Sequence, residues 1–219
     1  AHIGHLRNAA LGDSFVRLVR AVGYQVEVQN YIDNTGVQVA DVVVGFRQLL
    51  NMNLAEVRQI DKAFDYFCWD LYARVSDWYR EDSSRLHHRR EMLEAIEQAQ
   101  GEVAELADHI STRIVHAHLE TMLRIGVRYD VLPRESEILA LKFWDQAFEQ
   151  LRERRAIVYR EEGPHAGCWV MELPEEDGLP ADEKIIVRSN GTVTYVGKDI
   201  AYQLWKFGLL GKTFHFKPF

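Results

Sequence analysis

Helical spacing of apolar residues is the feature that most constrains the fold of this 219-residue chain. After Ile3, apolar side chains recur every three or four positions up to Val22, and Gly23 then ends the predicted helix. The same spacing predicts a helix over residues 37–50 and almost continuous helices over residues 54–126. The large aromatic residues of segment 64–72 are therefore expected to pack between helices.

Strand patterns interrupt the helices. Residues 25–29 alternate between polar and apolar side chains, and this predicts a strand that runs to about Ile32 and ends at the Asp33–Gly36 turn. The first 60 residues, which carry no net charge, are expected to form a packed αβα unit. A short strand at residues 129–132 precedes a helix that we expect from Pro133 to about residue 155.

Short β-like runs dominate after residue 157. Asn190-Gly191 gives the strongest hairpin signal, between segments 185–187 and 192–195. The pattern then predicts a last helix over residues 199–207 and a strand over residues 213–216.

Composition excludes several classes of protein. The chain carries 26 Lys and Arg against 33 Asp and Glu, a net charge of −7, which does not favour wrapping nucleic acid. A 47% hydrophobic content excludes a disordered chain, and no stretch approaches the ~20 apolar residues of a membrane span. The N-terminus lacks the pattern of a signal peptide. Two cysteines cannot build a disulfide framework, which favours a reducing cytoplasmic compartment.

His2-Ile3-Gly4-His5 stands at the start of the first predicted helix. The unpaired N–H groups and the partial positive charge of a helix N-terminus favour phosphate. Gly4 has no side chain, so a flat base or ribose can lie on the backbone. Two imidazoles beside it can donate hydrogen bonds to a phosphate whose charge rises in a transition state.

The surroundings of this motif resemble the catalytic domain of arginyl-tRNA synthetase, a class I aminoacyl-tRNA synthetase. The resemblance continues through Leu6-Arg7-Asn8, Gly12-Asp13 and segment 29–38. Residues 187–201 independently resemble the family's segment RxDGTxTYxxxDIA, with Asn190 in place of the usual Asp. The likeness covers essentially the whole chain and is strongest over residues 1–48 and 184–219.

The resemblance implies an α/β fold with a Rossmann-like parallel-sheet nucleotide-binding core and a largely helical insertion. Residues 1–52 would form the first part of the core, residues 53–183 the helical connective insertion with short strands, and residues 184–219 the return to the core. The implied activity is ATP-dependent activation of L-arginine to arginyl-adenylate, with Mg²⁺, followed by transfer to tRNA(Arg). The oligomeric state is left open, and no membrane partner is expected.

The resemblance also assigns residues to roles. His2 and His5 would be catalytic and contact the ATP phosphates, with Gly4 under the nucleoside. Tyr195 and Asp199 would bind the arginine side chain, because a carboxylate takes a guanidinium in a forked, charge-assisted pair. Gln38 matches a position near the amino-acid pocket. For Asp199 the competing interpretation is a cap at the start of the last helix.

Two other functions remain open. The family's second signature, KMSKS, does not occur in this chain, and the resemblance places it, with the anticodon-binding domain, beyond residue 219. The chain alone is therefore expected to turn over little or not at all. One alternative is a catalytically silent piece that binds arginine or ATP. The other is a nucleotidyltransferase of the same superfamily, which would have no need for the Tyr195–Asp199 pair.

No metal ligand is predicted. His116 and His118 point in different directions on a helix, and the adjacent His87 and His88 are not expected to share a face. Cys68 and Cys168 have no second ligand at metal spacing and are predicted to be buried or half-buried free thiols. The basic run of residues 85–90 is interpreted as a solvated helix end rather than a tRNA contact.

Overall fold

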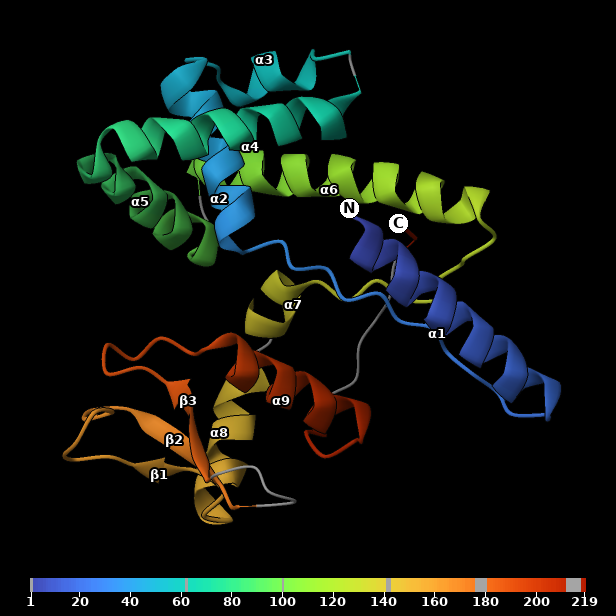
Figure 1. Cartoon of the computed structure of the whole chain (residues 1–219), viewed down its shortest axis with the longest axis vertical. Helices are drawn as coiled ribbons and strands as arrows, with labels where there is room; N and C mark the ends of the chain where they lie inside the picture. The colour runs from blue at the N-terminus through green and yellow to red at the C-terminus, as the bar shows by residue number, and fades with distance from the viewer. Residues whose placement is uncertain (1, 62, 100, 141–142, 176–180, 212–217) are drawn as a thin grey trace. The chain divides into compact units, whose positions relative to one another are not determined.

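The computed structural model describes residues 2–61, 63–99, 101–140, 143–175, 181–211 and 218–219, and it divides into two compact units. Unit 1 covers residues 1–136 and is helical, whereas unit 2 covers residues 137–219 and contains a small sheet (Figure 1). This division follows packing, so the assignment of residues 1–52, 53–183 and 184–219 to core and insertion stays a prediction.

Helices follow one another through unit 1, as the apolar spacing predicts. The elements are α1 (Ile3–Ala21), α2 (Val37–Val44), the π-helix η1 (Gly45–Leu49), α3 (Leu54–Arg58), α4 (Phe64–Glu81), the 3₁₀-helix η2 (Ser83–Arg85), α5 (Leu86–Glu97) and α6 (Gly101–Arg124). The predicted helices over residues 3–22, 37–50 and 54–126 are confirmed, the last as several separate helices.

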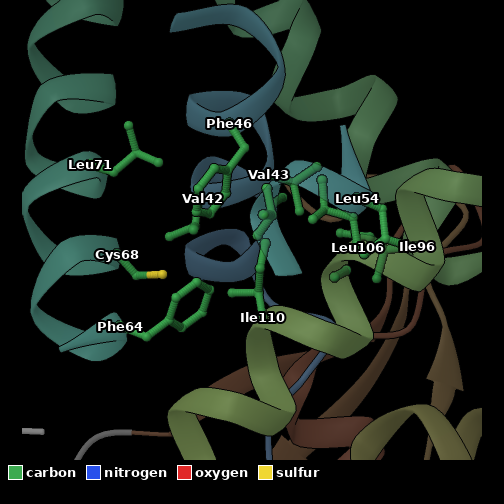
Figure 2. Packing of buried hydrophobic residues seen from close by; sticks show 13 residues of the cluster. Val42, Val43, Phe46, Leu54, Phe64, Cys68, Leu71, Ile96, Leu106 and Ile110 are labelled. Carbon is green, nitrogen blue, oxygen red and sulfur yellow. The ribbon is translucent and has the colours of Figure 1, made fainter. Parts of the chain in front are cut away.

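The main core of unit 1 surrounds α2. This helix contacts α4, α5 and α6, and Figure 2 shows its side chains meeting those of the neighbouring helices. Phe46, Leu71 and Ile110 come from η1, α4 and α6 and are almost completely buried. The predicted packing of aromatic residues between helices is confirmed at Phe64, which is buried, with its ring centroid 6.2 Å from that of Phe46. It is wrong at Tyr66 and Trp69, whose side chains are exposed.

Gly45 allows the closest approach in this core. A Cβ atom at this position would lie 2.5 Å from Cγ of Leu71, which is shorter than any ordinary contact. The junction of α2 and η1 can therefore lie against α4 only because residue 45 lacks a side chain.

Cys68 is a buried free thiol, and so is Cys168, as the sequence predicts. Burial raises the pKa of the Cys68 thiol to about 12. Because the thiolate is the reactive form, Cys68 is expected to resist a thiol reagent at pH 8 in the folded chain and to react fully in denaturant. Counting the modified cysteines by mass spectrometry checks this, and rapid modification of Cys68 in the folded chain would contradict it.

Helix α1 departs from the predicted packed αβα unit. None of its residues is buried, and Phe15 is 68% exposed. Its attachments are polar: Arg17 donates to the carbonyl of Gly126, and Arg20 donates to that of Val26. Apolar spacing predicts the helix correctly but does not determine whether another element covers its apolar face, and within the described residues none does.

The predicted parallel sheet is not seen among the described residues. The segments around residues 28–32 and 130–134 run parallel, but they form only two isolated bridges, Gln29–Val131 and Ile32–Arg134. Asn30 N–H donates to the carbonyl of Val131 at 3.0 Å, and Ile32 N–H to that of Pro133 at 2.8 Å. Two short segments, beside which no described residue forms a third strand, do not make a stable sheet, and Pro133 has no N–H to extend the ladder.

Unit 2 joins helices to an antiparallel sheet. Its elements are α7 (Glu135–Ala140, which begins in unit 1), α8 (Phe143–Glu153), β1 (Val158–Tyr159), β2 (Trp169–Leu173), β3 (Asp182–Val187) and α9 (Tyr195–Lys206). The strand order is β1-β2-β3, with Trp169 opposite both Tyr159 and Val187. Leu151, Ile157 and Ile186 form a second core with the rings of Trp144 and Phe148 packed against it.

The hairpin after β3 is shorter than predicted. Val187 and Val193 form one antiparallel bridge around the Asn190-Gly191 turn, and Tyr195 already belongs to α9. This helix begins four residues before the predicted residue 199, because the Thr194 side chain caps it by accepting from Gly197 N–H. The predicted strand over residues 213–216 lies outside the described residues.

Among the residues that the structure describes, no helix combines the length and apolar character needed to cross a lipid bilayer.

Candidate functional site

The His2–His5 motif caps α1 through its own side chains. His2 is the N-cap residue, and its Nδ1 atom accepts from Gly4 N–H at 3.0 Å. The Nδ1 atom of His5 accepts from His2 N–H at 3.1 Å, which completes a reciprocal capping box. The two ring centroids are 4.0 Å apart. The motif thus places two imidazoles side by side at the positive end of a helix.

This capping arrangement determines which ring nitrogen carries the proton. A nitrogen that accepts from an N–H has no proton of its own, so neutral His2 and His5 are protonated on Nε2. Partial burial, and then the neighbouring His2, lower the pKa of His5 and favour its neutral form. Each ring therefore offers an Nε2–H donor beside the helix N-terminus, and this suits an anionic ligand.

Gly4 is required by the position of the His2 ring. A Cβ atom on residue 4 would lie 2.8 Å from Cε1 of His2. Any side chain at this position would push away the imidazole that caps the helix.

Tyr195 and Asp199 lie one helical turn apart on α9, so they share a face as predicted. Both are exposed, Tyr195 at 76%. Because Thr194 caps α9, the competing interpretation of Asp199 as the helix cap is wrong. Asn190 accepts from the N–H and hydroxyl of Thr192, a role that an Asp would fill equally, so its departure from the family segment leaves the turn intact.

Gln38 is an exposed residue in the first turn of α2. It lies in unit 1 with His2, Gly4 and His5, whereas Tyr195 and Asp199 lie in unit 2. That these two groups of residues face one cavity stays a prediction.

A pocket of about 310 Å³ lies in unit 1, where the two parallel segments end. Its lining includes residues that directly follow these segments and residues from α6, namely Asn34, Thr35, Ser136, Glu105 and Asp108. In open α/β folds, ligands bind at the carboxyl ends of parallel strands. None of the predicted site residues lines this pocket.

Sequence reasoning missed the polar contacts that join the ends of these two segments. Thr35 donates to the carboxylate of buried Glu135 at 2.9 Å, and Asn34 donates to the hydroxyl of Ser136 at 2.9 Å. The sequence pattern predicts only a turn at Asn34 and Thr35. One signal in the sequence could have indicated these contacts. Asn34-Thr35 and Glu135-Ser136 each come shortly after a predicted strand.

The model for "tRNA synthetases class I (R), catalytic domain" matches residues 1–208. The chain belongs to this family. Its curated relatives include an arginine–tRNA ligase of Thermococcus kodakarensis, 37% identical over 94% of this chain and 33% of the relative. Another, from Deinococcus radiodurans, is 36% identical over 100% of this chain and 34% of the relative. The chain thus spans about a third of the length of the curated relatives that it matches.

Solved structures agree with this assignment. The arginyl-tRNA synthetase of Thermus thermophilus superposes with a TM-score of 0.75 at 35% identity, over 95% of this chain and 34% of that one. A Plasmodium falciparum arginyl-tRNA synthetase, at 13% identity, shares the fold with a TM-score of 0.71 over 94% of this chain and 32% of that one. The fold is therefore that of the family's catalytic region, although the described residues form little parallel sheet.

The prediction that His87 and His88 do not share a face is wrong for this member of the arginyl-tRNA synthetase family. The adjacent His87 and His88 were not expected to share a face, yet each offers a ligand atom within 4.8 Å of Glu91 and of the other. The two side chains lean together, with ring centroids 3.9 Å apart, because Trp78 stacks against His88 and Ser84 holds His87.

Proposed function

We propose that this chain supplies the nucleotide- and arginine-binding parts of an arginine–tRNA ligase. The reaction is activation of L-arginine by ATP to arginyl-adenylate and pyrophosphate, followed by transfer of the arginyl group to tRNA(Arg). Membership of the family and similarity to arginine–tRNA ligases support this activity. The observation that carries the proposal is the capping box, which leaves the Nε2–H groups of His2 and His5 to donate at a helix N-terminus.

In the first step a carboxylate oxygen of arginine attacks the α-phosphorus of ATP, and the bond to pyrophosphate breaks. Negative charge grows on the phosphate oxygens as this happens. Donors that are already in place stabilise such charge without reorganising, and the capping hydrogen bonds hold both imidazoles in place. ATP enters as its Mg²⁺ complex, and in this proposal Gly4 lies under the nucleoside, the role that the family resemblance assigns to it.

Arginine is recognised by its side chain in this proposal. The Asp199 carboxylate takes the guanidinium in a forked pair, and Tyr195, one turn earlier on α9, holds its flank. Lysine cannot reproduce the fork because its ammonium is a point charge. Gln38 contributes near the amino-acid pocket. The Rossmann-like core is part of the same proposal, and the two parallel bridges between residues 28–32 and 130–134 support it.

Replacing His2 or His5 with Ala in the natural full-length protein is expected to slow adenylate formation by roughly 10²–10³, the usual loss for one transition-state donor. Affinity for ATP should change less, because the contact strengthens as charge develops. Rapid-quench measurement of adenylate checks this, with His165→Gln as a control at a histidine in unit 2. Unchanged adenylate formation with weakened ATP binding would contradict the assigned roles.

The catalytically silent alternative predicts a different result for the same protein. The natural full-length protein would then bind ATP or arginine and form no adenylate. A nucleotidyltransferase would consume ATP with another acceptor and would be unaffected by changes at Asp199. Adenylate formation that depends on arginine separates the proposed ligase from both alternatives.

A further inference from the structure

A cluster of metal-ligating side chains lies at the start of α5, and the proposed ligase reaction does not use it. His87, His88 and Glu91 each offer one ligand atom, and these three atoms lie within 4.8 Å of one another. His87 and Glu91 are four residues apart on the helix, a spacing that puts side chains on one face. We propose that these three residues bind one divalent transition-metal ion, and that Zn²⁺ is the ion they bind best among biologically common metals.

His87 is already held as a metal ligand should be. Its Nδ1 atom lies 2.8 Å from the carbonyl oxygen of Ser84, and a carbonyl can only accept, so the proton is on Nδ1. The lone pair of the neutral ring is therefore on Nε2. Metal-binding histidines almost always donate their other N–H to a carbonyl or a carboxylate, which fixes the tautomer and the ring orientation.

The distance between the ligand atoms of His88 and Glu91 is close to that between two ligands of one metal ion. The Nδ1 atom of His88 lies 3.5 Å from Oε2 of Glu91. A tetrahedral site with metal–ligand distances of about 2.0–2.1 Å has edges of about 3.3–3.4 Å. This Nδ1 atom is buried and has no hydrogen-bond partner among the described residues. A buried nitrogen without a partner is unfavourable, and coordination would satisfy it.

The surroundings fix the ring and leave the carboxylate accessible. Trp78 stacks against His88 with ring centroids 5.6 Å apart, which limits rotation of that imidazole. Glu91 has a 59% exposed side chain, so an ion can reach it from solvent. Two of the three nearby arginines are paired, Arg85 with Glu81 at 3.0 Å and Arg89 with Asp41 at 2.7 Å, whereas Arg90 is exposed. The positive charges of the two paired arginines therefore oppose a bound cation less, and water and salt screen that of Arg90.

The donor set selects the metal. Two imidazole nitrogens and one carboxylate suit Zn²⁺, whereas Mg²⁺ prefers oxygen ligands in an octahedron. Three protein ligands leave a fourth position for water. These ligands differ from the oxygen ligands that the Mg²⁺ of the ATP complex prefers. Millimolar Mg²⁺ should therefore not compete with Zn²⁺ for the site.

The test is titration of the 219-residue chain with Zn²⁺ against a chromogenic chelator in the presence of a large excess of Mg²⁺ over Zn²⁺. We expect one Zn²⁺ per chain, and we expect each of His87→Gln, His88→Gln and Glu91→Gln to weaken it at least about tenfold. The matched control is Glu97→Gln, which removes the same charge from an exposed position on another face of the same helix and should leave the affinity within about twofold.

A second measurement keeps the test valid if His88→Gln disturbs its stack on Trp78. Zinc should shift the imidazole NMR signals of His87 and His88 and leave those of His165 unchanged. A chain that takes up no zinc at micromolar concentration would overturn the proposal. Equally, zinc that binds His87→Gln and Glu91→Gln as tightly as the unsubstituted chain would place the ion elsewhere and overturn it.

Discussion

Replacing Arg89 with Met is expected to lower the free energy of unfolding by about 3–5 kcal/mol, because it leaves a buried carboxylate without its partner. Asp41 lies in α2 and is 0% exposed. Arg89, in α5, donates to both of its oxygens at 2.8 and 2.7 Å, and its guanidinium lies 4.9 Å from the ring centroid of Tyr79. Met keeps most of the side-chain volume and removes the fork.

The matched control for this prediction is the adjacent residue. Arg90→Met removes the same group from an exposed position and should change stability by no more than about 0.5 kcal/mol. A double variant, Asp41→Leu with Arg89→Met, should regain much of the loss, since it replaces both charges with apolar groups. Chemical unfolding followed by the helical circular-dichroism signal measures all three variants. Equal loss in Arg89→Met and Arg90→Met would show that the buried pair contributes nothing.

Replacing Asp199 with Asn is expected to weaken use of arginine by two to three decades or more in the natural full-length protein. A guanidinium that enters a partly dry pocket without its carboxylate costs about 3–5 kcal/mol, at about 1.4 kcal/mol per decade. Asp199 is exposed in the chain without ligand, so the cost arises only when arginine covers it. Steady-state activation of arginine, lysine and citrulline measures the loss. Asp199→Glu should recover part of it, because one extra methylene misaligns the fork.

Thr194→Ala provides the control that separates recognition from helix capping. Thr194 accepts from Gly197 N–H and donates to the carbonyl of Ile185, so its removal should lower the melting temperature through a loss of about 1 kcal/mol or more. Selectivity for arginine should persist in this variant. Asp199→Asn should instead lose selectivity for arginine and keep the melting temperature of the unsubstituted protein. A fall in melting temperature with unchanged selectivity in Asp199→Asn would contradict the assigned role.

The sequence predicts local structure in this chain better than it predicts partners. Apolar periodicity places the helices of unit 1 correctly, and Asn190-Gly191 marks the turn after β3. The same periodicity cannot reveal that the apolar face of α1 stays exposed, because spacing within a helix carries no information about other elements. The start of α9 was misplaced because the capping residue, Thr194, also belongs to a β-like run.

Polar contacts between residues far apart in the chain could not be predicted from the sequence either. Asp41 pairs with Arg89 and Thr35 with Glu135, at separations of 48 and 100 residues. No motif in a single sequence links such residues, although an Asp within the apolar segment 37–44 signals that a partner is needed. The signature His2–His5 was identified from sequence, whereas its capping geometry and the proton positions that follow required coordinates.

Arginine-dependent exchange of pyrophosphate into ATP tests the central claim most directly. The natural full-length protein is expected to catalyse this exchange with arginine and not with lysine or citrulline. His2→Ala and Asp199→Asn should each reduce the exchange by at least about 10². Absence of exchange with arginine in a folded full-length protein that binds ATP would contradict the account, as would exchange that both substitutions leave unchanged.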